Sequence, residues 1–86
     1  MSYDYKRLEA DLNELLAAMS AFTRSEIAEV EQFLSAGEYG LAFETLCGIA
    51  KEENKPVPAE LRPKVRKLAE QMEIDPNWWT ELTREE

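Results

Sequence analysis

Apolar side chains recur every three or four residues along the first quarter of the chain. Because steps of three and four residues return to the same side of an α-helix, this spacing predicts an amphipathic helix with one apolar stripe. Asp4 or Ser2 is expected to cap its first turn. The stripe consists of Tyr5, Leu8, Leu12, Leu15 and Met19.

A second helix is predicted to begin near Arg24. Residues 23–26, Thr-Arg-Ser-Glu, match a capping box, in which Thr23 and Glu26 each accept a hydrogen bond from the other's backbone amide. Gly37 is expected to end the helix in the left-handed conformation that glycine adopts without a side-chain penalty. The buried stripe should be Ile27, Val30, Phe33 and Leu34.

The third helix is predicted from about Glu38 to Glu53, and its apolar face is wider than that of the other helices. Such a width is typical of the central member of a bundle. Gly40 and Gly48 each cost about 1 kcal/mol against alanine inside a helix. We therefore expect the backbone of a neighbouring helix to approach at one or both glycines.

Residues 54–58, Asn-Lys-Pro-Val-Pro, form the clearest break in the pattern, because proline is excluded from helix interiors. A fourth helix is predicted to open at Pro58 or Ala59, with Pro63 tolerated in its first turn. Asp75 and Pro76 then predict a cap and a short terminal helical turn. At least one ring of the Trp78-Trp79 pair should fix that turn to the bundle, and the sequence leaves open which ring is exposed.

These elements predict an all-α fold, a compact bundle of four helices plus a short C-terminal helical turn. No segment alternates in the manner of a strand. Hydrophobic residues make up 44% of the 86 positions, which is enough for one core, so residues 1–86 are expected to form a single domain. Short connections favour neighbouring helices that run roughly antiparallel.

The net charge of −8, from 18 acidic and 10 basic residues, narrows the choice of partner. Nucleic acid and anionic lipid are both disfavoured, because each requires an excess of Lys and Arg. Steered association with a basic protein is favoured, although many acidic proteins are simply soluble. The charge is also uneven: residues 24–53 hold seven glutamates against one Arg and one Lys, whereas the fourth helix is rich in Lys and Arg.

Catalytic and metal-binding residues are scarce. The chain has no histidine and one cysteine, which leaves no zinc site and no common general base, and it has no glycine-rich phosphate loop. We therefore expect neither enzymatic activity nor a cofactor. Cys47 is expected to be a buried thiol in a reducing compartment. With no signal segment and no membrane span, the expected location is the cytoplasm.

Residues 33–46, Phe-Leu-Ser-Ala-Gly-Glu-Tyr-Gly-Leu-Ala-Phe-Glu-Thr-Leu, resemble the central signature of the MafI-like immunity proteins. The Pro-Val-Pro break at 56–58 and residues 68–72 are similar too, so the resemblance spans about residues 26–75. Proteins of this family are antitoxins of polymorphic and contact-dependent growth-inhibition toxins. The resemblance implies a cytoplasmic inhibitor that binds one cognate toxin domain, commonly a nuclease. Gly37, Glu38, Tyr39 and Ala42 are the matching positions.

Together, charge and resemblance predict an immunity protein that occludes the active site or substrate groove of a basic toxin domain. It is expected to be a monomer that forms a 1:1 heterodimer with the toxin. Tyr39 is either an interface anchor or a residue that packs at the edge of the core with its hydroxyl in water. The alternative function is a helical adaptor, which would use the seam of the first helix or an exposed tryptophan. The expected contact residues are Glu26, Glu29, Glu31, Glu38, Tyr39 and Glu44.

Overall fold

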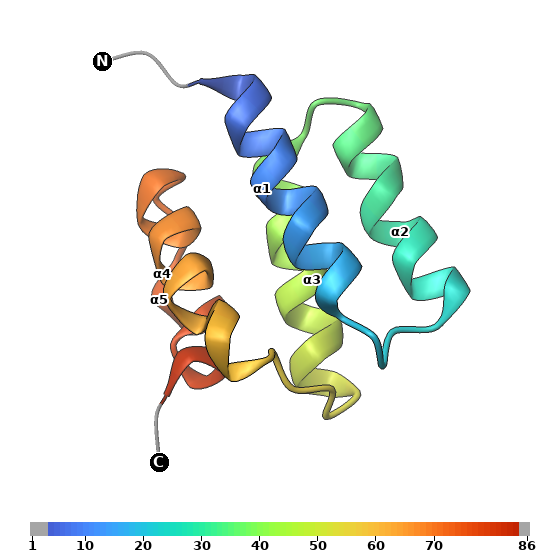
Figure 1. Cartoon of the computed structure of the whole chain (residues 1–86), viewed down its shortest axis with the longest axis vertical. Helices are drawn as coiled ribbons and strands as arrows, with labels where there is room; N and C mark the ends of the chain where they lie inside the picture. Colours follow the sequence, from blue (N-terminus) through green and yellow to red (C-terminus); the bar gives the residue numbers. More distant parts are fainter. Residues whose placement is uncertain (1–3, 85–86) are drawn as a thin grey trace.

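The computed structural model describes residues 4–84 as a helical bundle without a strand in that range (Figure 1). Four longer helices are followed by a single-turn helix, which confirms the predicted all-α class. The helices are α1 (Tyr5–Ala18), α2 (Arg24–Ser35), α3 (Tyr39–Glu52), α4 (Arg62–Gln71) and α5 (Pro76–Trp79). Two 3-10 turns, η1 (Ala59–Leu61) and η2 (Glu81–Thr83), complete the fold.

The third helix is the centre of the bundle, as its wide apolar face predicted. In Figure 1, α2 lies on one side of α3, α4 and α5 lie on the other, and α1 crosses in front. The buried core draws on every long helix, and α3 contributes five side chains that are almost fully inaccessible to solvent. These are Ala42, Phe43, Leu46, Cys47 and Ala50.

The first two helices begin and end where local sequence signals predict. Asp4 Oδ1 accepts a hydrogen bond from the backbone amide of Arg7, whereas Ser2, the other candidate cap, lies outside the described residues. Both hydrogen bonds of the Thr23–Glu26 capping box are present. Gly37 has a φ of 75°, and this left-handed residue lets two backbone amides bond back to carbonyls of the last turn of α2.

The start of the fourth helix differs from the prediction. The chain forms the 3-10 turn η1 after Pro58, and the α-helix proper begins only at Arg62. Pro63 has no N–H with which to close an α-helical bond to the Ala59 carbonyl. The amide of Arg62 donates to that carbonyl instead, and this shorter bond makes the turn a 3-10 turn.

The C-terminal turns pack against α3 and α4 through the two tryptophans. Trp79 is buried, and its Nε1 donates to the Ile74 carbonyl at 3.2 Å, while Trp78 remains 37% exposed.

The prediction of close backbone approach at the α3 glycines is wrong. A Cβ at Gly48 would lie 3.4 Å from the Trp78 ring, and one at Gly40 would lie 3.9 Å from the Ile74 side chain. Side chains of the C-terminal segment occupy the space that these glycines leave.

Candidate functional site

The predicted contact glutamates lie on α2, on the turn after it and on α3. Glu29 and Glu31 are exposed on α2, Glu38 is exposed at the turn, and Glu44 is half-buried on α3. Glu29 and Glu31 are two positions apart, which places their side chains about 200° from each other around the helix axis. We call Glu29, Glu31 and Glu38 the acidic surface. It wraps around an edge helix and does not form one flat face.

The acidic surface is separated from the basic residues of α4. The basic residues of α4 are Arg62, Lys64, Arg66 and Lys67. In Figure 1, α4 and α2 lie on opposite sides of α3. Within residues 4–84, no member of the acidic surface forms an ion pair. The carboxylates of the acidic surface are therefore not neutralised by ion pairs within the described part of the chain.

Glu26 differs from the other predicted contact residues, because its carboxylate already has partners inside the chain. Its Oε1 accepts from Lys55 Nζ at 2.6 Å and from the Thr23 backbone amide at 2.8 Å. The hydrogen bond from Lys55, and then the one from Thr23, lower the pKa of Glu26. This geometry gives Glu26 a structural role at the start of α2.

Tyr39 packs at the edge of the core beside Tyr5, with the two ring centroids 6.3 Å apart. Its hydroxyl donates to Glu9 Oε1 at 3.5 Å. Desolvation, followed by the charge of Glu9, raises the pKa of Tyr39. Tyr39 therefore packs at the edge of the core, as one of the two sequence interpretations expected, except that its hydroxyl meets the Glu9 carboxylate; its role as an interface anchor stays a prediction. Tyr39 also lines an open hollow of about 240 Å³ together with Tyr5, Leu8, Gly37, Gly40 and Met72.

Two exposed apolar side chains, Leu41 on α3 and Trp78 on α5, form a strip along α3; from the sequence, only an exposed tryptophan was considered. Leu41 is 44% exposed, and Trp78 lies beside Gly48, two turns further along the same face of α3. Lys51 makes a cation–π contact with this tryptophan, since the Lys51 Nζ lies 5.8 Å from the centroid of the Trp78 ring. The same Nζ donates to the Asn77 carbonyl at 2.7 Å. The glycine at position 48 was the available signal, because a larger residue would displace the ring.

Within residues 4–84 the folded chain has neither a cluster that could hold a metal ion nor a reactive thiol. Among residues 4–84, no three His, Cys, Asp or Glu side chains are placed so that they could hold a metal ion. The Cys47 thiol is buried, and desolvation raises its pKa to about 12. This thiol is therefore protonated at neutral pH and is a poor nucleophile. No helix in the described range has the length and apolar character needed to cross a bilayer.

Comparisons of the chain with protein-family models, with curated proteins and with solved structures found no match. The resemblance to the MafI-like immunity proteins therefore stays a prediction from residues 26–75.

Proposed function

We propose that this chain is a cytoplasmic immunity protein that binds a cognate, basic toxin domain and neutralises it. It forms a 1:1 complex and has no catalytic activity of its own. The toxin domain is a nuclease, whose substrate groove carries the Lys and Arg side chains that hold phosphates. Carboxylates of the acidic surface take the place of those phosphates, so the nucleic acid is excluded from the groove.

The observation that supports this proposal best is the position of the acidic surface on an edge helix. Glu29 and Glu31 project from different sides of α2, and neither is neutralised within residues 4–84. A helix of this kind fits between the two walls of a basic groove and presents a carboxylate to each wall. Glu38 extends the contact at the end of α2, and Glu44 and Tyr39 border it. Opposite charges on the two partners also speed their encounter.

A helical adaptor remains the second candidate, and the exposed strip of Leu41 and Trp78 is the observation that favours it. The apolar stripe of the first helix does not favour an adaptor, because all of its members except the exposed Tyr5 are buried in the core of the chain itself: Leu8, Leu12, Leu15 and Met19. An adaptor that pairs through Leu41 and Trp78 would self-associate or bind an apolar partner. A mass measurement in solution separates the two candidates, since the immunity protein is expected to be a monomer.

The direct test uses a candidate basic nuclease toxin domain, which is to be sought in the reading frame next to the gene of this chain. Cells that express the toxin domain should survive when the wild-type chain is co-expressed, and the two proteins should co-purify in equal amounts. Reversing Glu29 and Glu31 to Lys should abolish protection. The matched control reverses Glu60 and Glu70, two exposed glutamates on the α4 side, and should still protect. Equal protection by both variants would contradict the proposed role of α2.

A further inference from the structure

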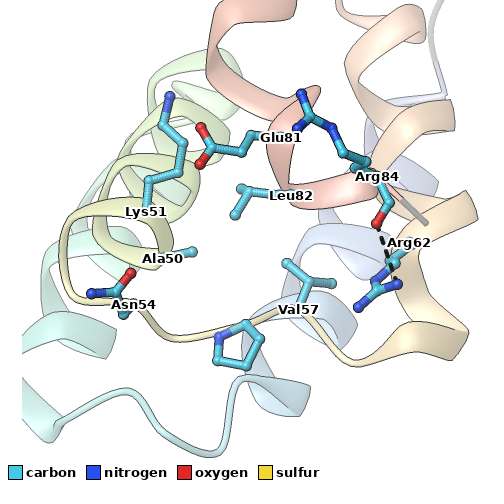
Figure 2. Close-up of a pocket in the computed structure, with 9 residues that line it drawn as sticks. Ala50, Lys51, Asn54, Val57, Arg62, Glu81, Leu82 and Arg84 are labelled. Carbon is cyan, nitrogen blue, oxygen red and sulfur yellow. Dashed lines mark hydrogen bonds between the residues drawn. The ribbon is translucent and has the colours of Figure 1, made fainter. Parts of the chain in front are cut away.

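A cavity of about 470 Å³ opens between the end of α3, the loop before η1, the start of α4 and the C-terminal turns (Figure 2). Ala50, Val57 and Leu82 give it an apolar floor. Lys51, Glu81, Arg84 and Arg62 surround that floor in Figure 2. The cavity thus combines an apolar base with a charged rim, a combination typical of sites for small organic ligands.

Arg62 on this rim has unused hydrogen-bonding capacity. Its Nε is buried without a partner, and its Nη1 makes only a long bond of 3.4 Å to the Arg84 carbonyl. No other hydrogen bond joins this guanidinium to residues 4–84. A buried N–H without an acceptor is unfavourable, and native proteins rarely retain one without a reason. The edge formed by Nε and Nη2 presents two parallel N–H groups, the arrangement that binds a carboxylate through both of its oxygens.

The charge around the cavity is positive, although the whole chain carries −8. A second cavity of about 230 Å³ shares Arg62, and the two together are lined by Lys51, Arg62, Arg66, Lys67 and Arg84 against Glu70 and Glu81. No ion pair joins any of these groups within the described range. In the larger cavity Lys51 is engaged with Asn77 and Trp78, so Arg62 and Arg84 are the cations of that cavity left for a ligand.

We propose that this cavity binds the carboxylate of a ligand that carries a short apolar body. The Nε edge of Arg62 turns toward the carboxylate, Arg84 adds a second positive charge, and Val57 with Leu82 contacts the body. A phosphate dianion fits less well, because Glu81 on the same rim repels additional negative charge. The carboxylate belongs either to a free organic acid or to the last residue of a peptide. This site is separate from the acidic surface and does not depend on the proposed function.

The test is an NMR titration of the full chain at neutral pH and constant ionic strength, with N-acetyl-leucine as the probe. Saturable shifts are expected at the Val57 and Leu82 methyl groups and at the Arg62 Nε–H signal. N-acetyl-leucinamide has the same apolar body without the charge and should bind at least about tenfold more weakly, because it loses the charge-assisted hydrogen bonds. Equal affinity for acid and amide, or tighter binding of inorganic phosphate, would overturn the proposal.

Single substitutions in the full chain show which residues bind N-acetyl-leucine. Arg62→Gln should weaken binding of N-acetyl-leucine about tenfold or more, and Arg84→Gln should weaken it less. Lys6→Gln is the matched control, since Lys6 is an exposed cation in the first turn of α1 and should leave the affinity unchanged. If Arg62→Gln and Arg84→Gln both fold, as judged by their amide spectra, and both bind like the wild type, the site is not the one proposed.

A longer probe identifies the source of the carboxylate. If acetyl-Ala-Ala-Leu binds more tightly than N-acetyl-leucine, the natural ligand is a peptide C-terminus. Equal affinity of the two probes points to a free acid. Both results support the site, whereas failure of both probes to saturate would contradict it. None of these outcomes bears on toxin binding, so the two proposals fail independently.

Discussion

The carboxylate of Glu26 and the ammonium of Lys55 form an ion pair of 2.6 Å between residues that are 29 positions apart. Glu26 lies in the first turn of α2, and Lys55 follows the end of α3, where its own amide donates to the Ala50 carbonyl. The pair therefore ties the beginning of α2 to the end of α3 and helps to fix how these two helices align.

Replacing Glu26 by Gln should lower stability at neutral pH. Glutamine can still complete the capping box, so the change isolates the pairing with Lys55. The folded-state pKa of Glu26 lies below the ordinary value of 4.5, so its stabilising contribution is present above that value. The contribution is lost as the pH falls through the lowered pKa.

Urea unfolding at pH 7 and at pH 3 measures this effect. The difference between wild type and Glu26→Gln should be largest at pH 7 and should shrink at pH 3. Glu29→Gln removes an exposed carboxylate with no ion pair in the described chain and should leave the midpoint nearly unchanged. A Glu26→Gln variant as stable as the wild type at both pH values would rule out this role for the ion pair.

Gly48→Ala should stabilise the chain by about 0.5–1 kcal/mol, because alanine removes the entropic cost of glycine in a helix interior. The added Cβ would lie 3.4 Å from the Trp78 ring, which is an ordinary contact distance. Gly48→Leu should instead displace that ring. Urea unfolding of the two variants tests how closely the Trp78 ring packs on residue 48. A loss of stability in Gly48→Ala would show that this contact is tighter than described.

The Cys47 thiol should resist modification in the folded protein. Its pKa is raised from 9.0 to about 12, mainly by burial, so almost no thiolate exists at pH 8. Because the folded-state value is the higher one, stability is expected to fall as the pH rises above about 9. A disulfide reagent at pH 8 should label Cys47 only after unfolding in urea. In a Ser25→Cys variant, the added exposed thiol should react at once, and equally fast labelling of Cys47 would contradict its burial.

The two tryptophans should differ sharply in their effect on stability. Trp79→Ala removes a buried ring and its hydrogen bond to Ile74, which should cost about 3–5 kcal/mol. Trp78→Ala removes a ring that is 37% exposed and should cost clearly less. Thermal unfolding of both variants provides the comparison, and equal losses would argue against the buried position of Trp79.

Local signals explain why much of this fold was predictable. The capping box at Thr23 and Glu26 and the left-handed turn at Gly37 depend only on neighbouring residues, and both were predicted. Periodic leucines likewise placed the first helix in the core. The start of α4 was missed, because the sequence pattern does not reveal how Pro63 alters the hydrogen bond to Ala59.

The candidate sites were harder to predict, since they depend on how distant segments pack. The sequence predicted the bond of Glu26 to the Thr23 amide, but only the fold shows that Lys55 pairs with the same carboxylate. Two other features arise only when the C-terminal turns pack against α3 and α4. These are the contact between Gly48 and the Trp78 ring and the unpartnered Nε of Arg62. The sequence showed that residues 24–53 are rich in glutamate, but the arrangement of the acidic surface around α2 required the structure.

The proposed role of the acidic surface is tested most directly by the rate at which this chain associates with a basic toxin domain that it is found to neutralise, followed by stopped flow at low and high salt. The wild-type chain should associate fast, and its association rate should fall as salt is added. Reversal of Glu29 and Glu31 to Lys should slow association at least about tenfold at low salt and flatten the salt dependence. Reversal of Glu60 and Glu70 changes the net charge equally and should have a much smaller effect. If both reversals slow association to the same extent, net charge alone governs the encounter, and the acidic surface around α2 has no specific role.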